Sequence, residues 1–109
     1  MVTSQFKHLF SPFQLKNLTL PNRIVSTAHA TVLADDGRPG PRFIAYQAEK
    51  AKGGCGLIIA CGAGAVHPSS PGSEWGLIQL FDDSVIPHLR NFTAAVHRYD
   101  SKIICQMSH

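Results

Sequence analysis

Apolar and polar residues alternate near the start of the chain, and this alternation predicts β structure. Between Phe13 and Leu20 the pattern turns about Lys16-Asn17, which is typical of a two-stranded hairpin. Pro21-Asn22 breaks the pattern, and residues 23–27 are rich in β-branched side chains, which favour a strand. The chain is therefore expected to open with a hairpin followed by a strand.

The centre of the chain, from Gly53 to Gly64, contains a short unbroken apolar run at residues 57–59. A run without polar positions predicts a strand buried on both faces, as in a parallel sheet. A helix is disfavoured because the run is short and each flanking glycine would weaken a helix by about 1 kcal/mol. Glycines just past such a strand let the backbone approach either a neighbouring element or a ligand, and the sequence leaves both open.

Two longer segments have the spacing of an amphipathic helix. The first begins near Pro41, because proline suits the first turn, and runs to about Lys52. The second can be capped by Asp82, Asp83 or Ser84. The apolar positions expected to face the core are Ile44, Ala48 and Ala51 in the first helix and Val85, Leu89, Phe92, Val96 and Tyr99 in the second.

Two loops and a last strand complete the pattern. Turn residues crowd the segment 33–41. A second loop, at about 63–81, is long enough to suggest a function or a lid. Residues 102–109 then predict a third buried strand.

The order hairpin, strand, helix, strand, helix, strand indicates an α/β protein with parallel strands joined by right-handed crossovers. Two architectures fit this order, the start of an eight-stranded β/α barrel and an open doubly wound sheet. The second would place a dinucleotide site at Gly62-Ala63-Gly64, with Asp82 about twenty residues further on. Such a site needs a helix directly after the glycines, and the proline-rich stretch that follows cannot start one, so the dinucleotide interpretation is disfavoured.

The composition narrows the class of partner. The chain has 109 residues and a formal net charge of only +3, and its basic residues are scattered, so a nucleic-acid surface is not expected. No apolar stretch is long enough to span a bilayer, and the first residues do not form a secretory signal. A cytoplasmic protein that acts on a small-molecule substrate is therefore expected.

The residues alone suggest little metal or redox chemistry. Cys105 and His109 lie at i and i+4 on one face of the last expected strand, but a zinc site needs further ligands and none is suitably spaced. Cys61 has no cationic neighbour in sequence, so an inert buried thiol is preferred to a redox thiol. Three cysteines, an odd number, fit reduced buried thiols better than a disulfide framework. We expect no metal site within this chain.

Four ordered motifs carry a resemblance to a known family. They are Leu9-Phe10-Ser11-Pro12-Phe13, Leu18-Thr19-Leu20-Pro21-Asn22-Arg23-Ile24-Val25, Ala48-Glu49-Lys50-Ala51-Lys52-Gly53-Gly54 with Gly56-Leu57-Ile58-Ile59, and Gln106-Met107-Ser108-His109. Together they resemble the opening of the Old Yellow Enzyme family of NADH:flavin oxidoreductases. Ala28-His29-Ala30 resembles the trimethylamine dehydrogenase and 2,4-dienoyl-CoA reductase branch more than the plain enone reductases.

The resemblance implies an FMN-binding (β/α)8 TIM barrel, with NAD(P)H as the expected reductant. It also implies which residues bind the cofactor. Ala28, His29 and Ala30 would lie along the flavin, partly through their backbone, Gly62 would let the ring approach, and the Gln106 amide would face the pyrimidine edge. Ala30 departs from relatives that carry threonine or cysteine there, so other groups would have to tune the flavin.

On this interpretation residues 1–109 are the incomplete N-terminal part of the barrel domain, about three β/α units preceded by a hairpin that closes its N-terminal end. The complete protein would transfer hydride through flavin to or from an activated alkene or an N-methyl amine, and a homo-oligomer is expected. Its catalytic residues, its phosphate site and any iron-sulphur cluster would lie beyond His109, and the fragment itself would be inactive. The alternative is a non-catalytic interaction module that pairs through an exposed sheet edge.

Overall fold

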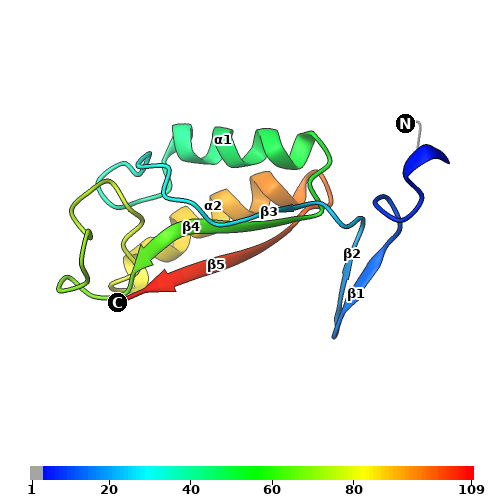
Figure 1. Ribbon diagram of the computed structural model, residues 1–109. Helices are drawn as coiled ribbons and strands as arrows, with labels where there is room; N and C mark the ends of the chain where they lie inside the picture. The colour runs from blue at the N-terminus through cyan, green and yellow to red at the C-terminus, as the bar shows by residue number, and fades with distance from the viewer. Residues whose placement is uncertain (1–3) are drawn as a thin grey trace.

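The computed structural model describes residues 4–109 and contains two helices and five strands, together with two short 3-10 turns. The strands pair in two separate sheets, and the helices alternate with three of the strands (Figure 1). The 3-10 turns are η1 (Ser4–Phe6) and η2 (Asp83–Val85); the strands are β1 (Phe13–Leu15), β2 (Leu18–Leu20), β3 (Val25–Ser26), β4 (Leu57–Ala65) and β5 (Lys102–Ser108); and the helices are α1 (Pro41–Lys52) and α2 (Ile86–His97).

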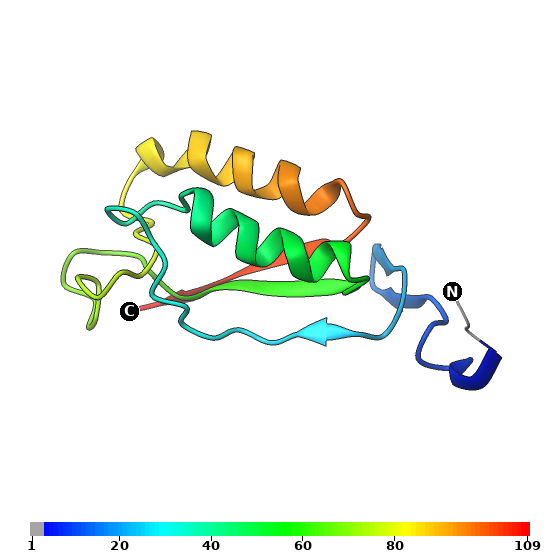
Figure 2. The same ribbon diagram turned by 90° about the horizontal axis from the view of Figure 1, so that it is seen from above.

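The larger sheet is parallel, with the strand order β3-β4-β5. Both helices lie on the same face of this sheet, and from above they run side by side over the strands (Figures 1 and 2). Two β/α units are therefore present, followed by a third strand with no helix after it in residues 4–109. The α/β class is as expected, but the third of the expected units consists here of its strand only.

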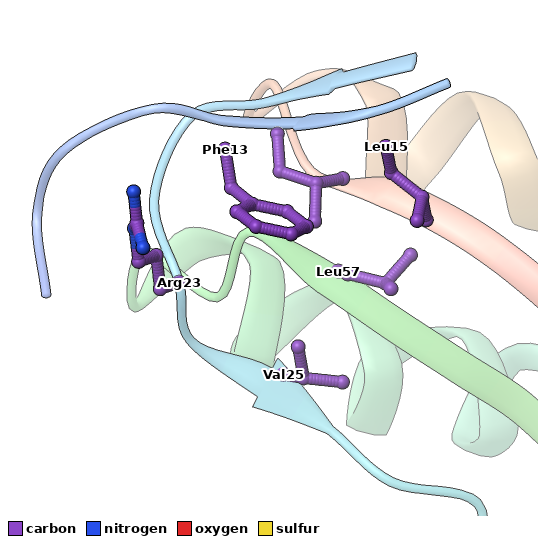
Figure 3. A pocket seen from close by; sticks show the side chains of 6 residues that line it. Phe13, Leu15, Arg23, Val25 and Leu57 are labelled. Atoms are coloured by element: carbon purple, nitrogen blue, oxygen red, sulfur yellow. The ribbon is translucent and has the colours of Figure 1, made fainter. Parts of the chain in front are cut away.

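The hairpin forms where the alternation predicts it. β1 and β2 pair antiparallel with Phe13 opposite Leu20 and Leu15 opposite Leu18, so the turn falls at Lys16-Asn17. The hairpin lies by the N-terminal ends of β3 and β4, and a largely apolar cavity of about 310 Å³ separates it from the sheet (Figure 3). The residues lining this cavity are Phe13, Leu15, Leu20, Arg23, Val25 and Leu57.

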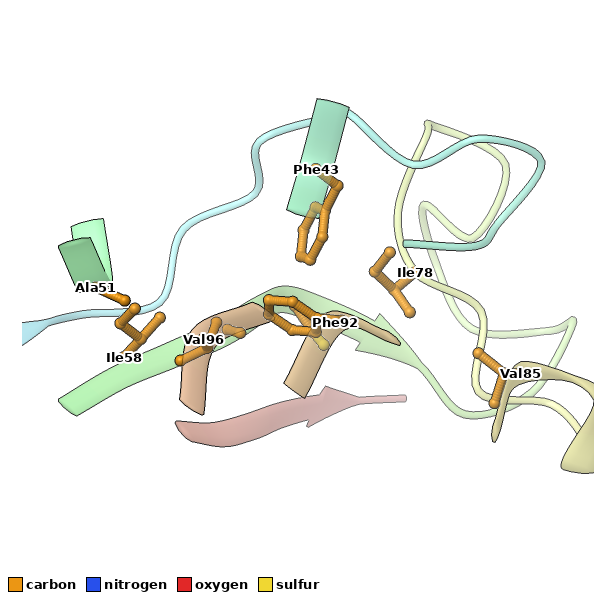
Figure 4. Packing of buried hydrophobic residues seen from close by; sticks show 9 residues of the cluster. Phe43, Ala51, Ile58, Ile78, Val85, Phe92 and Val96 are labelled. Atoms are coloured by element: carbon orange, nitrogen blue, oxygen red, sulfur yellow. The ribbon is translucent and has the colours of Figure 1, made fainter. Parts of the chain in front are cut away.

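The core lies between the sheet and the two helices. Phe43 of α1 and Phe92 of α2 pack edge to face, with ring centroids 5.0 Å apart, and the buried side chain of Ile58 in β4 lies further along the cluster, beside Ala51 and Val96 (Figure 4). Ile78, from the loop after β4, closes one end of this cluster. Burying each of these large side chains contributes about 1.5–3 kcal/mol, so this layer stabilises the packing of both helices on the sheet.

The buried face of α1 differs from the expected one. Phe43, Gln47 and Ala51 are its buried residues, whereas Ile44 and Ala48 are only half-buried. Ala51 is therefore buried as expected, and Ile44 packs against the core cluster from a half-buried position. The expected stripe did not include Phe43, whose ring packs against Phe92, or Gln47.

Asp82 caps the short turn before α2 rather than α2 itself. Its side chain accepts a hydrogen bond from the backbone N–H of Ser84 at 2.8 Å at the start of η2, whereas Val85, which precedes α2, makes no side-chain cap. Pro87 lies in the first turn of α2, as expected. Hydrogen bonds from Ser84 hold the pKa of Asp82 below its ordinary value. Tyr99, expected in the apolar stripe, lies beyond the end of the helix and is 38% exposed.

Neither helix described here is long and apolar enough to cross a membrane.

β4 is much longer than the apolar run that predicted it. It continues to Ala65, and the long loop after it begins at Val66 rather than at about residue 63. Its pairing with β5 is irregular, because Ala60 is opposite Cys105 but Gly64 is opposite Met107. The extra residues form a bulge at Cys61-Gly62, where both φ angles are positive.

The first expected strand, in contrast, is shorter than 23–27, since only Val25 and Ser26 pair with β4.

The expectation that the third strand is buried is wrong. Most of β5 is exposed, including Ile104 at 41%, and Val25 of β3 is 43% exposed on the same face of the sheet. Ile103 packs toward the helices, so by strand alternation Ile104 points to the other face. In residues 4–109 only the hairpin reaches this face, at its N-terminal end beside Val25 and Leu57. The sheet therefore has one face covered by helices and one largely open apolar face.

This open face generates a prediction for the 109-residue chain in solution. We expect the isolated chain to associate at micromolar concentration, because the apolar face and the unpaired edge of β5 are both accessible. Analytical ultracentrifugation together with calorimetry measures this directly. A monomer with a sharp cooperative melt would contradict the expectation. A complex of one defined stoichiometry would instead favour the interaction-module alternative.

Candidate functional site

The segments that hold the five predicted cofactor residues meet at one end of the sheet. Ala28, His29 and Ala30 follow β3, Gly62 lies in the second half of β4, and Gln106 lies near the end of β5. All three strands run parallel, so these positions share the carboxyl edge, where the long loop and the C-terminus also lie (Figure 1). Ligands in open and closed parallel α/β folds bind at this edge.

Gly62 is the point of closest approach between two of these segments. A Cβ atom placed on Gly62 would lie 2.5 Å from the carbonyl oxygen of His29 and 2.7 Å from the Cα of Ala30. Its φ of +64° is also a conformation that glycine adopts without cost. Of the two possibilities that the sequence left open for this glycine, the structure shows a neighbouring element, the backbone of residues 29–30, at the position that a side chain would occupy. Gly62 also lies within β4 rather than after it.

Gln106 joins the third strand to this contact. Its side-chain Nε2 donates a hydrogen bond to the carbonyl oxygen of Gly62 across the gap between β5 and β4. The side chain is otherwise exposed, and a primary amide has a second N–H and a carbonyl oxygen to offer. Gln106 thus both braces the bulge and keeps polar atoms available to a ligand.

The His29 side chain points away from this contact, toward α1. Its Nε2 is 2.9 Å from the hydroxyl of Tyr46, and its Nδ1 is 3.4 Å from the carbonyl oxygen of Thr27. The Nζ of Lys50 lies 4.5 Å above the Tyr46 ring and donates a hydrogen bond to Ser26. These contacts engage both nitrogens of the imidazole, so His29 offers its backbone rather than its ring to the carboxyl edge.

The backbone of the segment after β3 has capacity to bind a ligand. Within residues 4–109, none of the N–H groups of residues 28–33 donates a backbone hydrogen bond, whereas that of Ala34 donates to Gly76 at 3.1 Å. Peptide groups that lack such partners must be satisfied by water or by a ligand. Ala30 contributes no polar side-chain atom, so the polar contacts of this segment are those of its main chain. The arrangement fits a flat, polar-edged ligand that takes hydrogen bonds from backbone and amide groups.

Sequence reasoning missed a second set of polar residues at this edge. The hydroxyl of Ser70, which is only 2% exposed, lies 3.1 Å from Nδ1 of His109 and accepts a hydrogen bond from the backbone N–H of His67 at 3.2 Å. These bonds tie the long loop after β4 to the end of β5. No short-range signal pairs a serine with a histidine 39 residues further along the chain.

The described residues give no support to a metal centre. In residues 4–109 no group of three or more histidine, cysteine or acidic side chains is close enough to hold a metal ion. Of the three cysteines, Cys61 is buried as expected, Cys55 is half-buried and Cys105 is exposed. The expectation of uniformly buried thiols is therefore wrong for Cys105, because β5 lacks a neighbour on its outer edge.

Comparison with a solved structure defines the class of fold. The Old Yellow Enzyme from Trypanosoma cruzi matches with a TM-score of 0.81 and 27% identity, over 97% of this chain and 28% of that protein. The strand and helix order described above thus corresponds to part of a barrel-type flavoenzyme fold.

The sequence comparisons define the family. Residues 8–109 match the NADH:flavin oxidoreductase / NADH oxidase family, and the chain belongs to it. An N,N-dimethylglycine/sarcosine dehydrogenase from Chromohalobacter salexigens is 46% identical over 95% of this chain. A multifunctional alkene reductase/demethylase from Caballeronia cordobensis is 39% identical over all of it. The chain spans only 15% and 16% of the length of these two relatives.

The contact at Gly62 generates a stability prediction. We expect Gly62→Ala to lower the free energy of unfolding well beyond the roughly 1–2 kcal/mol that a left-handed conformation costs, because the new methyl group meets backbone atoms that cannot move aside. Gly54→Ala is the matched control. Gly54 also has a positive φ, of +100°, but a Cβ there would meet nothing within 4 Å.

Denaturant unfolding of the complete protein measures both variants. The Gly54 variant reports the cost of a side chain at a positive φ without a clash, and a larger loss for the Gly62 variant reports the clash. Equal losses for both variants would show that the approach of residues 29–30 to Gly62 is not a constraint on the fold.

Proposed function

We propose that the complete protein is an FMN-dependent oxidoreductase and that this chain supplies one wall of its flavin site. The observation that carries the proposal is the convergence of Ala28–Ala30, Gly62 and Gln106 at the carboxyl edge of a parallel sheet. Membership of the NADH:flavin oxidoreductase family supports FMN as the cofactor and a nicotinamide as the reductant. When bound, FMN supplies reversible hydride transfer, a reaction that no amino-acid side chain performs.

Each residue would have a distinct part in holding the cofactor. The Gln106 amide would donate to and accept from the polar edge of the ring. The main chain of Ala28–Ala30 would line the ring with N–H and carbonyl groups that have no other backbone partner in the described residues. Gly62 would act indirectly, because its contact with residues 29–30 sets the position of that main chain.

The chain supports the binding of the cofactor rather than the chemistry of the substrate. We assign no catalytic residue to residues 1–109. The phosphate of the cofactor and the groups that anchor and protonate the substrate would come from the rest of the barrel, as would any iron-sulphur cluster. Residues 1–109 are then the N-terminal portion of one FMN-binding domain, with the hairpin closing the end of the barrel opposite the flavin.

The substrate class follows from the relatives. Their names describe dehydrogenation of N-methyl amines, demethylation and alkene reduction. The substrates proposed here are accordingly an N-methyl amine, which would lose hydride, or an activated alkene, which would gain it. We also propose that the complete protein is a homo-oligomer. The open apolar face is not the argument for this, because the remaining strands of the barrel would cover it.

Cofactor binding by the complete protein tests the proposal. We expect the purified protein to be yellow and its apoprotein to quench the fluorescence of added FMN. Gln106→Leu should weaken FMN binding roughly 5- to 150-fold, because losing the partner of a buried polar group costs about 1–3 kcal/mol. Gln14→Leu, a change of the same type in the hairpin at the other end of the sheet, should leave the affinity unchanged.

Two outcomes would contradict the proposal. One is a colourless protein that leaves the spectrum and fluorescence of FMN unaltered. The other is a Gln106→Leu variant that binds FMN as tightly as its Gln14→Leu control. Turnover of N-methyl amines and enones by the holoenzyme then decides between the two substrate classes.

A further inference from the structure

Two cysteines from neighbouring strands share one small cavity on the helix-covered face of the sheet. Cys61 in β4 and Cys105 in β5 both line a cavity of about 190 Å³, together with Leu89, Phe92 and Thr93 of α2. The pairing register explains their proximity, because Cys105 is opposite Ala60, the residue directly before Cys61. The two thiols also lie within hydrogen-bonding distance of each other, so their sulphur atoms need only a small movement to form a disulfide.

The bulge in β4 brings the two thiols to the same face. In a regular strand Cys61 would point away from the face on which Ala60 and the helices lie. Cys61 instead has a φ of +71° and packs in the core cluster with Ala60 and Phe92. A positive φ at a residue other than glycine is uncommon and is concentrated at functional positions. Here the unusual conformation turns the Cys61 side chain toward Cys105.

The surroundings of the two thiols differ in a way that gives them separate roles. A hydrogen bond between the two thiols and burial raise the pKa of Cys61, and the same hydrogen bond lowers the pKa of Cys105. Cys105 is therefore the thiol that more readily becomes the nucleophilic thiolate.

We propose that Cys61 and Cys105 form a redox-active pair that hydroperoxides oxidise to an intrachain disulfide joining β4 to β5. In the first step the Cys105 thiolate attacks the peroxide O–O bond, giving the Cys105 sulfenic acid, and the other oxygen leaves after protonation as water from hydrogen peroxide or as an alcohol from an organic hydroperoxide. In the second step the Cys61 sulphur displaces hydroxide from the Cys105 sulphur, the S–S bond forms, and the Cys61 proton leaves as part of a second water molecule. Each peroxide thus takes up the two electrons that the pair loses, and an external thiol reverses the reaction by exchange.

The location gives the pair a structural consequence. Cys61 directly precedes Gly62, and Cys105 directly precedes Gln106, the two residues that are joined by the amide-to-carbonyl hydrogen bond. A disulfide would link β4 and β5 covalently beside this hydrogen bond, on the opposite face of the sheet. The position of the bulge would then depend on the oxidation state of the pair.

Peptide mapping of the complete protein after treatment with hydrogen peroxide tests the proposal. Trypsin releases residues 53–90 as one peptide, which contains Cys55 and Cys61, and cuts after Lys102 to release the peptide that contains Cys105. We expect peroxide to join these two peptides with the loss of two hydrogen atoms, and dithiothreitol to separate them. Fragmentation of the joined peptides in the wild-type protein should place the bond at Cys61 rather than at Cys55.

Two variants test which cysteine forms the bond with Cys105. Cys55→Ala is the matched control and should keep the cross-link, because Cys55 lies five residues before Ala60, roughly 16 Å away along the strand. Cys61→Ala should abolish the cross-link and leave a Cys105 sulfenic acid that dimedone traps. A bond at Cys55, a Cys105 that is oxidised to sulfinic acid in the wild type without cross-linking, or two thiols that both remain alkylatable after peroxide would each overturn the proposal. None of these results depends on whether the protein binds FMN.

Discussion

The carboxyl edge of the sheet depends on one close backbone contact, between Gly62 and residues 29–30. No side chain fits between them, since even a methyl group on Gly62 would overlap the carbonyl of His29. The bulge at Cys61-Gly62 places the main chain for this contact, and Gln106 braces it from β5. The position of the segment after β3, and with it the proposed flavin wall, therefore follows from a left-handed turn in the middle strand.

The helices α1 and α2 pack against only one face of the sheet that forms this edge. The two helices bury Phe43, Phe92 and Ile58 in a single layer, while the opposite face of the sheet exposes Val25 and Ile104. Such asymmetry is what a segment of a barrel has when the strands that would line the interior with it are not present. The same open face supports the proposal of a larger domain.

Local patterns predicted most of the elements, because the hairpin turn, the N-terminal proline of α1 and the Asp82 cap are signals that short stretches carry. They did not predict the extension of β4 to Ala65, since glycines in a strand look like a loop until a partner strand satisfies their backbone. Local patterns also could not show which distant residues come into contact. Phe43 packs against Phe92, His29 contacts Tyr46, and Cys61 shares a cavity with Cys105, and the members of each pair are far apart in the sequence.

A crystal structure of the complete protein with bound FMN tests the central claim most directly. The account predicts the isoalloxazine ring against the main chain of Ala28–Ala30, with the Gln106 amide at its polar edge and with Gly62 still packed beneath residues 29–30. A ring bound elsewhere would contradict the account. So would a ring separated from Gln106 and from the segment after β3 by other parts of the protein.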